Sequence, residues 1–131
     1  MHQYKLRVYY EDTDAQGVVY YANYLKFFER ARTEFLRTAG YEQKSLMADG
    51  AIFMVRDLSL TLQKPARLDD ELTISTKLIK LGKVTFDFKQ EALRGDMLLC
   101  SGDIRCGCID GKSFTPYKLP NELYSRMKNL L

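Results

Sequence analysis

The chain has 131 residues, enough for one domain whose core can fold without disulfides or a metal ion. Its 20 basic and 17 acidic residues are scattered, so the net charge of +3 arises without the runs of like charge that favour nucleic acid as a partner. No apolar stretch approaches the roughly 20 residues that cross a bilayer, and no N-terminal signal pattern is present. We therefore expect a single domain over residues 1–131, in the cytoplasm and without a membrane span.

The first predicted element is a strand from Tyr4 to Tyr10, because the character of the side chains alternates there. One face carries Tyr4, Leu6, Val8 and Tyr10, and the other carries Lys5, Arg7 and Tyr9. An acidic loop that contains Gly17 follows this strand and leads into a long helix.

Asp14 lies in this loop, and its position supports two interpretations. An aspartate before a helix most often forms a turn or caps the helix. Alternatively, its carboxylate lies beside a helix start, where backbone N–H groups are unpaired and the helix dipole is positive. A carboxylate next to such donors provides the two groups needed to open a polarised carbonyl compound such as a thioester. The residues alone leave both interpretations open.

A helix is predicted from about Ala22 to Ala39, where the apolar spacing becomes helical. One stripe carries Tyr24, Phe28, Ala31, Phe35 and Ala39, and Gly40 supplies a C-terminal stop. Burial of the three aromatic side chains would contribute roughly 1.5–3 kcal/mol each, more than helix propensity supplies. The helix must therefore be covered by other elements.

Alternating strands follow a short polar-apolar stretch from Tyr41 to Gly50. They are predicted over residues 58–63, 72–78, 84–89 and about 97–109, with turns at Gly82-Lys83 and Arg94-Gly95-Asp96. A short helix is expected from about Asn121 to Leu130. One strand, one long helix and four further antiparallel strands make an α+β pattern in which a sheet wraps a single helix. The periodicities permit more than one such fold.

The three cysteines, Cys100, Cys106 and Cys108, are odd in number, which argues against a secreted disulfide framework. Cys106 and Cys108 share one face of a predicted strand, but no histidine or further cysteine nearby completes the four ligands of a structural zinc site. We interpret both as packing residues and expect no metal site.

Several motifs of the first 37 residues resemble the signature of the hot-dog-fold acyl-CoA thioesterases. They are Asp12-Thr13-Asp14, Gly17-Val18-Val19-Tyr20, Asn23-Tyr24 and the run from Phe28 to Glu34. The nearest branch is the YbgC type, which is associated with the Tol-Pal genes, and the hydroxybenzoyl-CoA thioesterases are more distant relatives. The resemblance implies a hot-dog fold, with a five-stranded antiparallel sheet wrapped around one long helix.

The resemblance also implies an enzyme that hydrolyses acyl-CoA to free acid and coenzyme A. In this family the second aspartate of the motif, here Asp14, is catalytic, either as nucleophile or as general base. Backbone amides around Tyr20 and Tyr21 would polarise the carbonyl, and Asp12 and Gly17 would support the loop. No cofactor is expected, because coenzyme A is part of the substrate.

One position departs from the nearest branch. The YbgC-type pattern has Val-Val-Tyr-His where this chain has Val18-Val19-Tyr20-Tyr21, and the only histidine of the chain is His2. A mechanism that needs an imidazole at that position is therefore not expected. Tyrosine there is similar to the hydroxybenzoyl-CoA branch and hints at aryl acyl groups.

Two further segments are weaker candidates. Glu29 belongs to the family signature, but along a helix it could simply pair with Arg32 or contact Thr33. Lys64-Pro65-Ala66-Arg67 could meet the phosphates of coenzyme A, or be ordinary solvated surface.

Two alternatives to a thioesterase stay open. A hydratase or dehydratase of the same fold resembles sites with a His-Asp or His-Glu pair, which this chain lacks. The other alternative is a non-catalytic module that binds acyl-CoA or an acyl carrier protein, since fold does not dictate activity. An acyl carrier protein is also a candidate partner of the enzyme itself. Family resemblance further implies a homodimer with sites at the interface, or a homotetramer of two such dimers.

Overall fold

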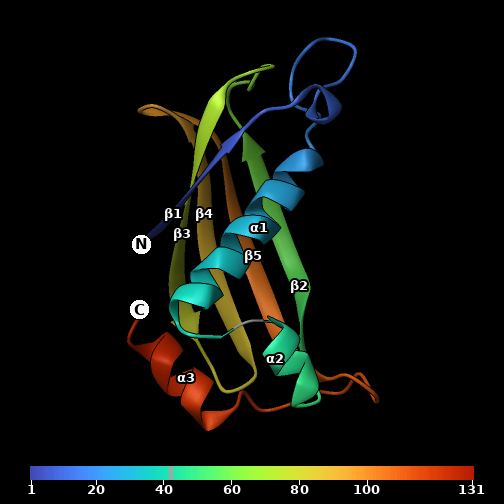
Figure 1. Cartoon of the computed structure of the whole chain (residues 1–131), viewed down its shortest axis with the longest axis vertical. Helices are drawn as coiled ribbons and strands as arrows, with labels where there is room; N and C mark the ends of the chain where they lie inside the picture. Colours follow the sequence, from blue (N-terminus) through green and yellow to red (C-terminus); the bar gives the residue numbers. More distant parts are fainter. Residues whose placement is uncertain (42) are drawn as a thin grey trace.

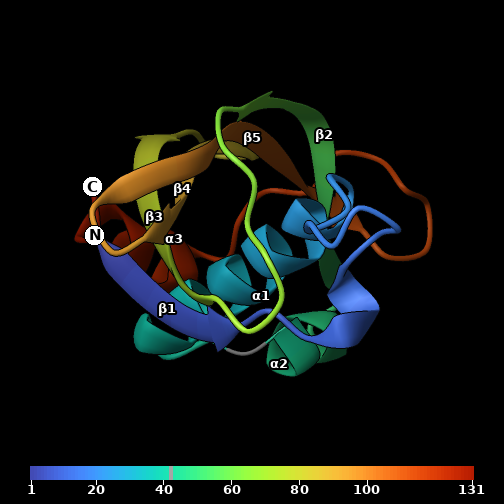
Figure 2. The ribbon, with the colours of Figure 1, turned by 90° about the horizontal axis from the view of Figure 1, so that it is seen from above.

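The computed structural model describes the backbone of residues 1–41 and 43–131, and the side chains of residues 1–41 and 46–131. Its elements in chain order are β1 (His2–Arg7), the 3-10 turn η1 (Tyr10–Asp12), α1 (Asn23–Thr38), α2 (Gln43–Ala48), β2 (Ala51–Leu62), β3 (Glu71–Leu81), β4 (Thr85–Arg94), β5 (Met97–Asp110) and α3 (Asn121–Lys128) (Figure 1). The strands form one antiparallel sheet in the order β1-β3-β4-β5-β2. The sheet curves around α1, with β1 and β2 at its two edges (Figure 2). The predicted α+β architecture, a five-stranded antiparallel sheet wrapped around one long helix, is confirmed.

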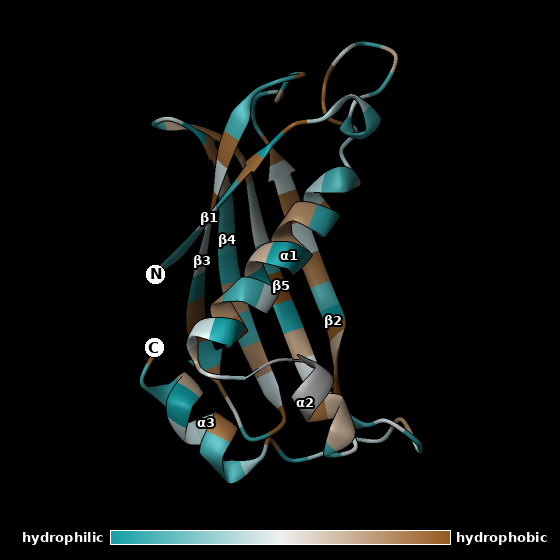
Figure 3. Ribbon diagram, viewed as in Figure 1, coloured by the Kyte–Doolittle hydropathy of each residue, from teal (hydrophilic) through white to brown (hydrophobic). Residues whose placement is uncertain are grey.

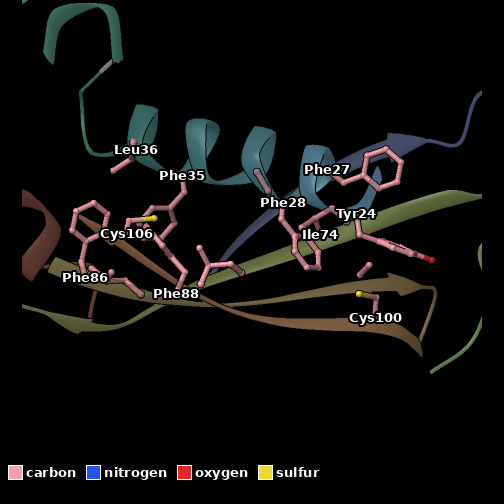
Figure 4. Close-up of a cluster of buried hydrophobic side chains, with 14 of the residues drawn as sticks. Tyr24, Phe27, Phe28, Phe35, Leu36, Ile74, Phe86, Phe88, Cys100 and Cys106 are labelled. Carbon is pink, nitrogen blue, oxygen red and sulfur yellow. The ribbon is translucent and has the colours of Figure 1, made fainter. Parts of the chain in front are cut away.

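The core lies between α1 and the concave face of the sheet. All five residues of the predicted stripe are buried, and Phe27 and Leu36 widen it. Phe35 packs edge-on against Phe88 of β4, with ring centroids 5.5 Å apart, and Ile74 of β3 lies below the same helix (Figure 4). Hydrophilic and hydrophobic positions alternate around α1 (Figure 3), as in an amphipathic helix. The sheet buries the apolar stripe of this helix.

The first strand is shorter than predicted. Alternation holds through Val8, which is buried, but β1 ends at Arg7 and Tyr10 is 83% exposed. The chain turns there because the backbone N–H of Asp12 donates to the carbonyl of Tyr9 (3.0 Å), while the Asp12 carboxylate accepts from the Tyr9 N–H (2.8 Å). The prediction that the strand extends to Tyr10 was therefore wrong.

β2 begins earlier than predicted, at Ala51 rather than near Leu58. It pairs with β5 over its whole length, with a bulge at Arg56 between Val55 and Asp57. The run from Ala51 to Val55 is apolar at every position, so it carries no period of two to reveal a strand. The predicted polar-apolar stretch before it contains α2, and Glu42 lies outside the described residues.

The predicted turns are observed. The Gly82 N–H donates to the Thr85 carbonyl (2.8 Å) between β3 and β4, and Gly95, with φ +60°, connects β4 to β5. The predicted C-terminal helix is α3, which ends at Lys128 and buries Leu123 and Met127 against the end of the core. Within the described part of the chain, no helix has the length and apolar character needed to cross a membrane.

Candidate active site

The loop before α1 folds back on itself as a tight turn around Asp14. Thr13 pairs with Val19 in an antiparallel bridge, and the Asp14 N–H donates to the Val18 carbonyl (2.9 Å). The Gly17 N–H in turn donates to the Asp14 carbonyl (3.0 Å), with Gly17 at φ +77°, a conformation that residues with a Cβ rarely adopt. This turn fixes where the Asp14 side chain begins.

One oxygen of the Asp14 carboxylate accepts a hydrogen bond, and the other has no partner in the described part of the chain. Oδ1 accepts the Gln16 N–H at 2.9 Å, whereas Oδ2 has no hydrogen-bond partner among the residues that the structure describes. The side chain is half-buried and lines a hollow of about 340 Å³. The other walls of the hollow are Val18, Val19, Tyr21, Tyr24 and residues 62–65, which form the end of β2 and the loop after it. The open oxygen can therefore reach a molecule in the hollow.

Asp12 is bound to the backbone instead. Besides the bond from Tyr9 to its carboxylate, its carbonyl accepts from the Tyr20 N–H (3.0 Å) and from the Asn23 side-chain amide (2.8 Å). Asp12 thus ties β1, the loop and the start of α1 together. The two aspartates of the motif, two residues apart, have different surroundings.

The start of α1 has free backbone amides, and one of them belongs to Tyr21, which lines the hollow. The Tyr20 N–H already donates to Asp12, so it is not available to a ligand, although the sequence predicted it as a donor. The N–H groups of Tyr21 and Ala22 have no acceptor in the described part of the chain, and Ala22 has no side chain that could cap the helix. These two amides lie at the positive end of the helix dipole, where a developing oxyanion is stabilised.

The tyrosine side chains of Tyr20 and Tyr21 lie directly before the start of α1. The rings of Tyr20 and Tyr21 lie 4.8 Å apart and are 45% and 58% exposed. A hydrogen bond with the Tyr21 side chain raises the pKa of the Tyr20 hydroxyl. Tyr21 lines the hollow, and behind it Tyr24 is buried, which raises the pKa of the Tyr24 hydroxyl. The phenols of Tyr20 and Tyr24 are therefore neutral at physiological pH.

The hollow is also bordered by the segment that follows β2. Lys64 lines it, and the loop carrying Asp14 is attached to this segment because the Val19 N–H donates to the Ala66 carbonyl (2.8 Å). Arg67 forms a bridge with Val18. Of the weaker candidates, Lys64 thus lies at the hollow, whereas Glu29 accepts from the Thr33 hydroxyl (3.2 Å) along α1.

The cysteines take no part in this site. All three are free and buried, and burial raises the pKa of each thiol to about 11. No group of three or more histidine, cysteine, aspartate or glutamate side chains that could hold a metal occurs among the described residues.

A second large hollow, of about 380 Å³, lies on the other face of the sheet beside Asp87 and Arg105. These two residues form a two-point ion pair at 2.8 and 2.9 Å. The Arg105 guanidinium holds the pKa of the Asp87 carboxyl below its usual range. Both oxygens of the Asp87 carboxylate are thus occupied by Arg105, whereas Asp14 keeps one oxygen without a partner among the described residues.

Comparison with known proteins identifies the family of the chain. The model of the thioesterase superfamily matches residues 16–101. The acyl-CoA thioesterase YbgC of Haemophilus influenzae is 38% identical, over 97% of this chain and 94% of its own length. The acyl-CoA thioester hydrolase YbgC of Escherichia coli O157:H7 is 39% identical, over 96% and 95%.

A solved structure of a hypothetical protein from Thermus thermophilus superimposes with a TM-score of 0.95 at 30% identity and covers 100% of both chains. The hot-dog fold implied by the motifs is thereby confirmed, as is the resemblance to the YbgC type. The chain belongs to the thioesterase superfamily.

Proposed function

We propose that the protein is an acyl-CoA thioester hydrolase with Asp14 as its catalytic residue. The observation that carries this proposal is an open carboxylate oxygen at the hollow together with two free amides at the adjoining start of α1. Asp14 supplies the oxygen, and Tyr21 and Ala22 supply the amides. The hydrolase names of the relatives support the same reaction class and do not favour the alternative, a non-catalytic binding module.

In the proposed reaction, the thioester carbonyl oxygen accepts hydrogen bonds from the amides of Tyr21 and Ala22, which stabilise the charge of the tetrahedral intermediate. Asp14 acts in one of two ways. It attacks the carbonyl carbon, expels the coenzyme A thiolate and forms a mixed anhydride that water then cleaves, or it takes a proton from water that attacks directly. Both routes end in free acid and coenzyme A.

No cofactor enters either route. A thiolate is a good leaving group, so the C–S bond breaks without a strong acid, and coenzyme A arrives as part of the substrate. The Lys64 ammonium beside the hollow is placed to pair with a phosphate of coenzyme A. An acyl carrier protein, which carries the same phosphopantetheine arm, is a second candidate donor of the acyl group. We place the reaction in the cytoplasm.

We further propose a homodimer joined along β2, and a homotetramer of two such dimers. Leu58 and Leu62 of this edge strand lie opposite the buried residues Ile104 and Cys100 of β5, so they point to the α1 face. They are nevertheless 46% and 53% exposed. A long apolar edge strand is usually covered, and a second copy of the same strand can cover it.

Release of free thiol tests the function. Acetyl-, butanoyl-, hexanoyl- and benzoyl-CoA are incubated with the purified protein, and the thiol is followed with a thiol reagent. We expect catalytic turnover with at least one of them. Binding of acyl-CoA without release of thiol would instead assign a non-catalytic module.

A further inference from the structure

A third hollow, the Arg32 hollow, lies under the N-terminal half of β2, away from Asp14. It has a volume of about 140 Å³, and its apolar walls include Phe53, Val55 and Phe86. Arg32 of α1 is the cationic residue of this hollow, and Glu29, one turn before it on α1, also lines it. A guanidinium among aromatic and aliphatic side chains is costly to bury unless its donors find acceptors.

Arg32 is held in place by a buried polar network. Its Nη1 donates to Oε1 of Gln90 at 2.9 Å, and Nε2 of Gln90 donates to the Thr76 hydroxyl and to the Phe28 carbonyl, both at 2.9 Å. Gln90 and Thr76 are fully buried. The amide side chain of Gln90 therefore cannot turn away, and it fixes where the guanidinium points.

The network leaves most of the Arg32 donors unused. A guanidinium has five N–H donors, and Gln90 is its one hydrogen-bond partner within the described part of the chain. Gln90 carries no charge, and no carboxylate of a described residue lies within the 4.0 Å of an ion pair with Arg32. Burial lowers the pKa of Arg32, while electrostatic interactions with Cys106 and Glu29 oppose that shift. The hollow thus contains an oriented cation with unused donors.

The Asp14 hollow lies at the C-terminal end of β2, and the Arg32 hollow lies beside the N-terminal half of the same strand. The Asp14 hollow is bounded by Leu62 and the Arg32 hollow by Val55, which are seven residues and so about 23 Å apart along one strand. Within one chain, packed side chains separate them, because Phe28 and Leu60 meet over Gly102 in the space between. One acyl group bound to a single chain would have to pass through this core.

A dimer along β2 removes that separation. If the sheet continues with both copies of α1 on the same face, the two-fold axis is perpendicular to the sheet and the two β2 strands run antiparallel. In the register that places Leu62 of one strand opposite Val55 of the other, these two residues lie about 5 Å apart across the pair. In that register the Asp14 hollow of one chain adjoins the Arg32 hollow of its partner.

We propose that the Arg32 hollow of one chain receives the distal end of an acyl group bound at Asp14 of the other chain. Arg32 thus acts in trans and favours acyl groups that bear an oxygen acceptor at that end. The acceptor is a hydroxyl or a carboxylate, and the volume admits a short or aromatic acyl group. This inference rests on the proposed hydrolysis of acyl-CoA. Arg32 touches no reacting atom in it and is a specificity residue.

Substrate pairs matched in size test the specificity. Benzoyl-CoA is compared with 4-hydroxybenzoyl-CoA, and butanoyl-CoA with succinyl-CoA. We expect kcat/KM to be at least about tenfold higher for an oxygen-bearing member, the scale of one hydrogen bond to a charged group. The first pair reports a hydroxyl and the second a carboxylate. Equal kcat/KM values within both pairs would overturn the inference but leave the hydrolase intact, whereas no thiol release from any acyl-CoA would refute the hydrolase itself.

Substitution of Arg32 tests the residue. Arg32→Gln keeps a donor for Gln90 but removes the charge and the spare donors, so we expect the kcat/KM ratio to fall to near one while hydrolysis of the plain acyl-CoA persists. Arg30→Gln, two residues away on the exposed face of α1, is the matched control and keeps the ratio. If Arg32→Gln does not fold, Arg32→Lys replaces it, with a reduced ratio expected. A ratio unchanged from that of the wild type would overturn the assignment.

Mixed dimers test whether Arg32 acts in trans. Asp14→Asn and Arg32→Gln chains with different tags are co-expressed and the heterodimer is purified. One of its two sites then combines Asp14 from one chain with Arg32 from the other, so the preference for the oxygen-bearing substrate should return to the wild-type ratio. If Arg32 acts within its own chain, the heterodimer will hydrolyse both members of each pair equally.

Discussion

The Asp14 hollow and the Arg32 hollow differ in how their functional side chains are positioned. Asp14 is positioned by bonds within a turn of seven residues, from Thr13 to Val19, and its carboxylate faces open space. Arg32 is positioned by Gln90, which is 58 residues away in the sequence and fully buried. In the proposed mechanism this difference separates two tasks, since a local turn supplies the reacting group and the packed core supplies recognition. It also predicts that substitutions in the Asp14 hollow change turnover, whereas substitutions in the Arg32 hollow change specificity or stability.

Removal of the reacting oxygen should have the largest effect. In Asp14→Asn the side-chain oxygen can still accept the Gln16 N–H, but the amide can neither attack nor take a proton. We expect kcat to fall at least about a hundredfold at saturating acyl-CoA, with an unchanged melting temperature. Turnover close to that of the wild type would refute the assignment of Asp14.

Asp12→Asn is the matched control for that variant. The Asp12 carboxylate accepts the Tyr9 N–H and lies outside the reaction, so this change should act mainly on stability. If Asp12→Asn abolished turnover in a fully folded protein, the roles of the two aspartates would be reversed.

Disruption of the proposed dimer should have the next largest effect on activity, because it separates the Asp14 hollow of one chain from the Arg32 hollow of the other. Leu58→Glu places a charge on the exposed apolar edge of β2, where it opposes pairing with a second copy. We expect light scattering to show a monomer and kcat/KM to fall at least about tenfold. Lys5→Glu, a charge change on the exposed face of the opposite edge strand β1, should leave both unchanged. A fully active monomer would show that each chain forms its site alone.

Disruption of the buried network should reduce stability rather than turnover. Gln90→Leu leaves the Thr76 hydroxyl and the Arg32 guanidinium without their shared partner. We expect unfolding in urea to show a loss of about 2–4 kcal/mol, because each stranded buried polar group costs about 1–3 kcal/mol. Gln3→Leu, at an exposed position of β1, should change stability by less than about 0.5 kcal/mol. Equal stabilities of the two variants would mean that the network does not hold Arg32.

The smallest effect is expected at Tyr21. The proposed donor is its backbone N–H, so Tyr21→Phe should keep kcat within about threefold, whereas Tyr21→Ala should reduce it further by opening the hollow. A fall of about 10²-fold for Tyr21→Phe, with unchanged thermal stability, would instead show that the phenol donates a hydrogen bond to the thioester.

The parts that could be predicted from the sequence are those set by short-range spacing. The buried stripe of α1 and the turn at Gly95 follow from local patterns, and Asp14 could be proposed as the catalytic residue because its whole motif lies within a few residues. The contact of Arg32 with Gln90 joins α1 to β4, and no periodicity encodes such a pair. Likewise, the loss of Tyr20 as a donor depends on where the carbonyl of Asp12 points, which only the folded turn determines.

The central claim concerns which groups surround the thioester, and a crystal structure of Asp14→Asn with an unhydrolysed acyl-CoA measures this directly. We predict the carbonyl oxygen at about 2.7–3.1 Å from the backbone nitrogen of Tyr21 or Ala22, with the carbonyl carbon next to the substituted side chain and the acyl group directed toward the second chain. A carbonyl oxygen bound only by the Tyr21 phenol, or a thioester lying outside the Asp14 hollow, would contradict the account.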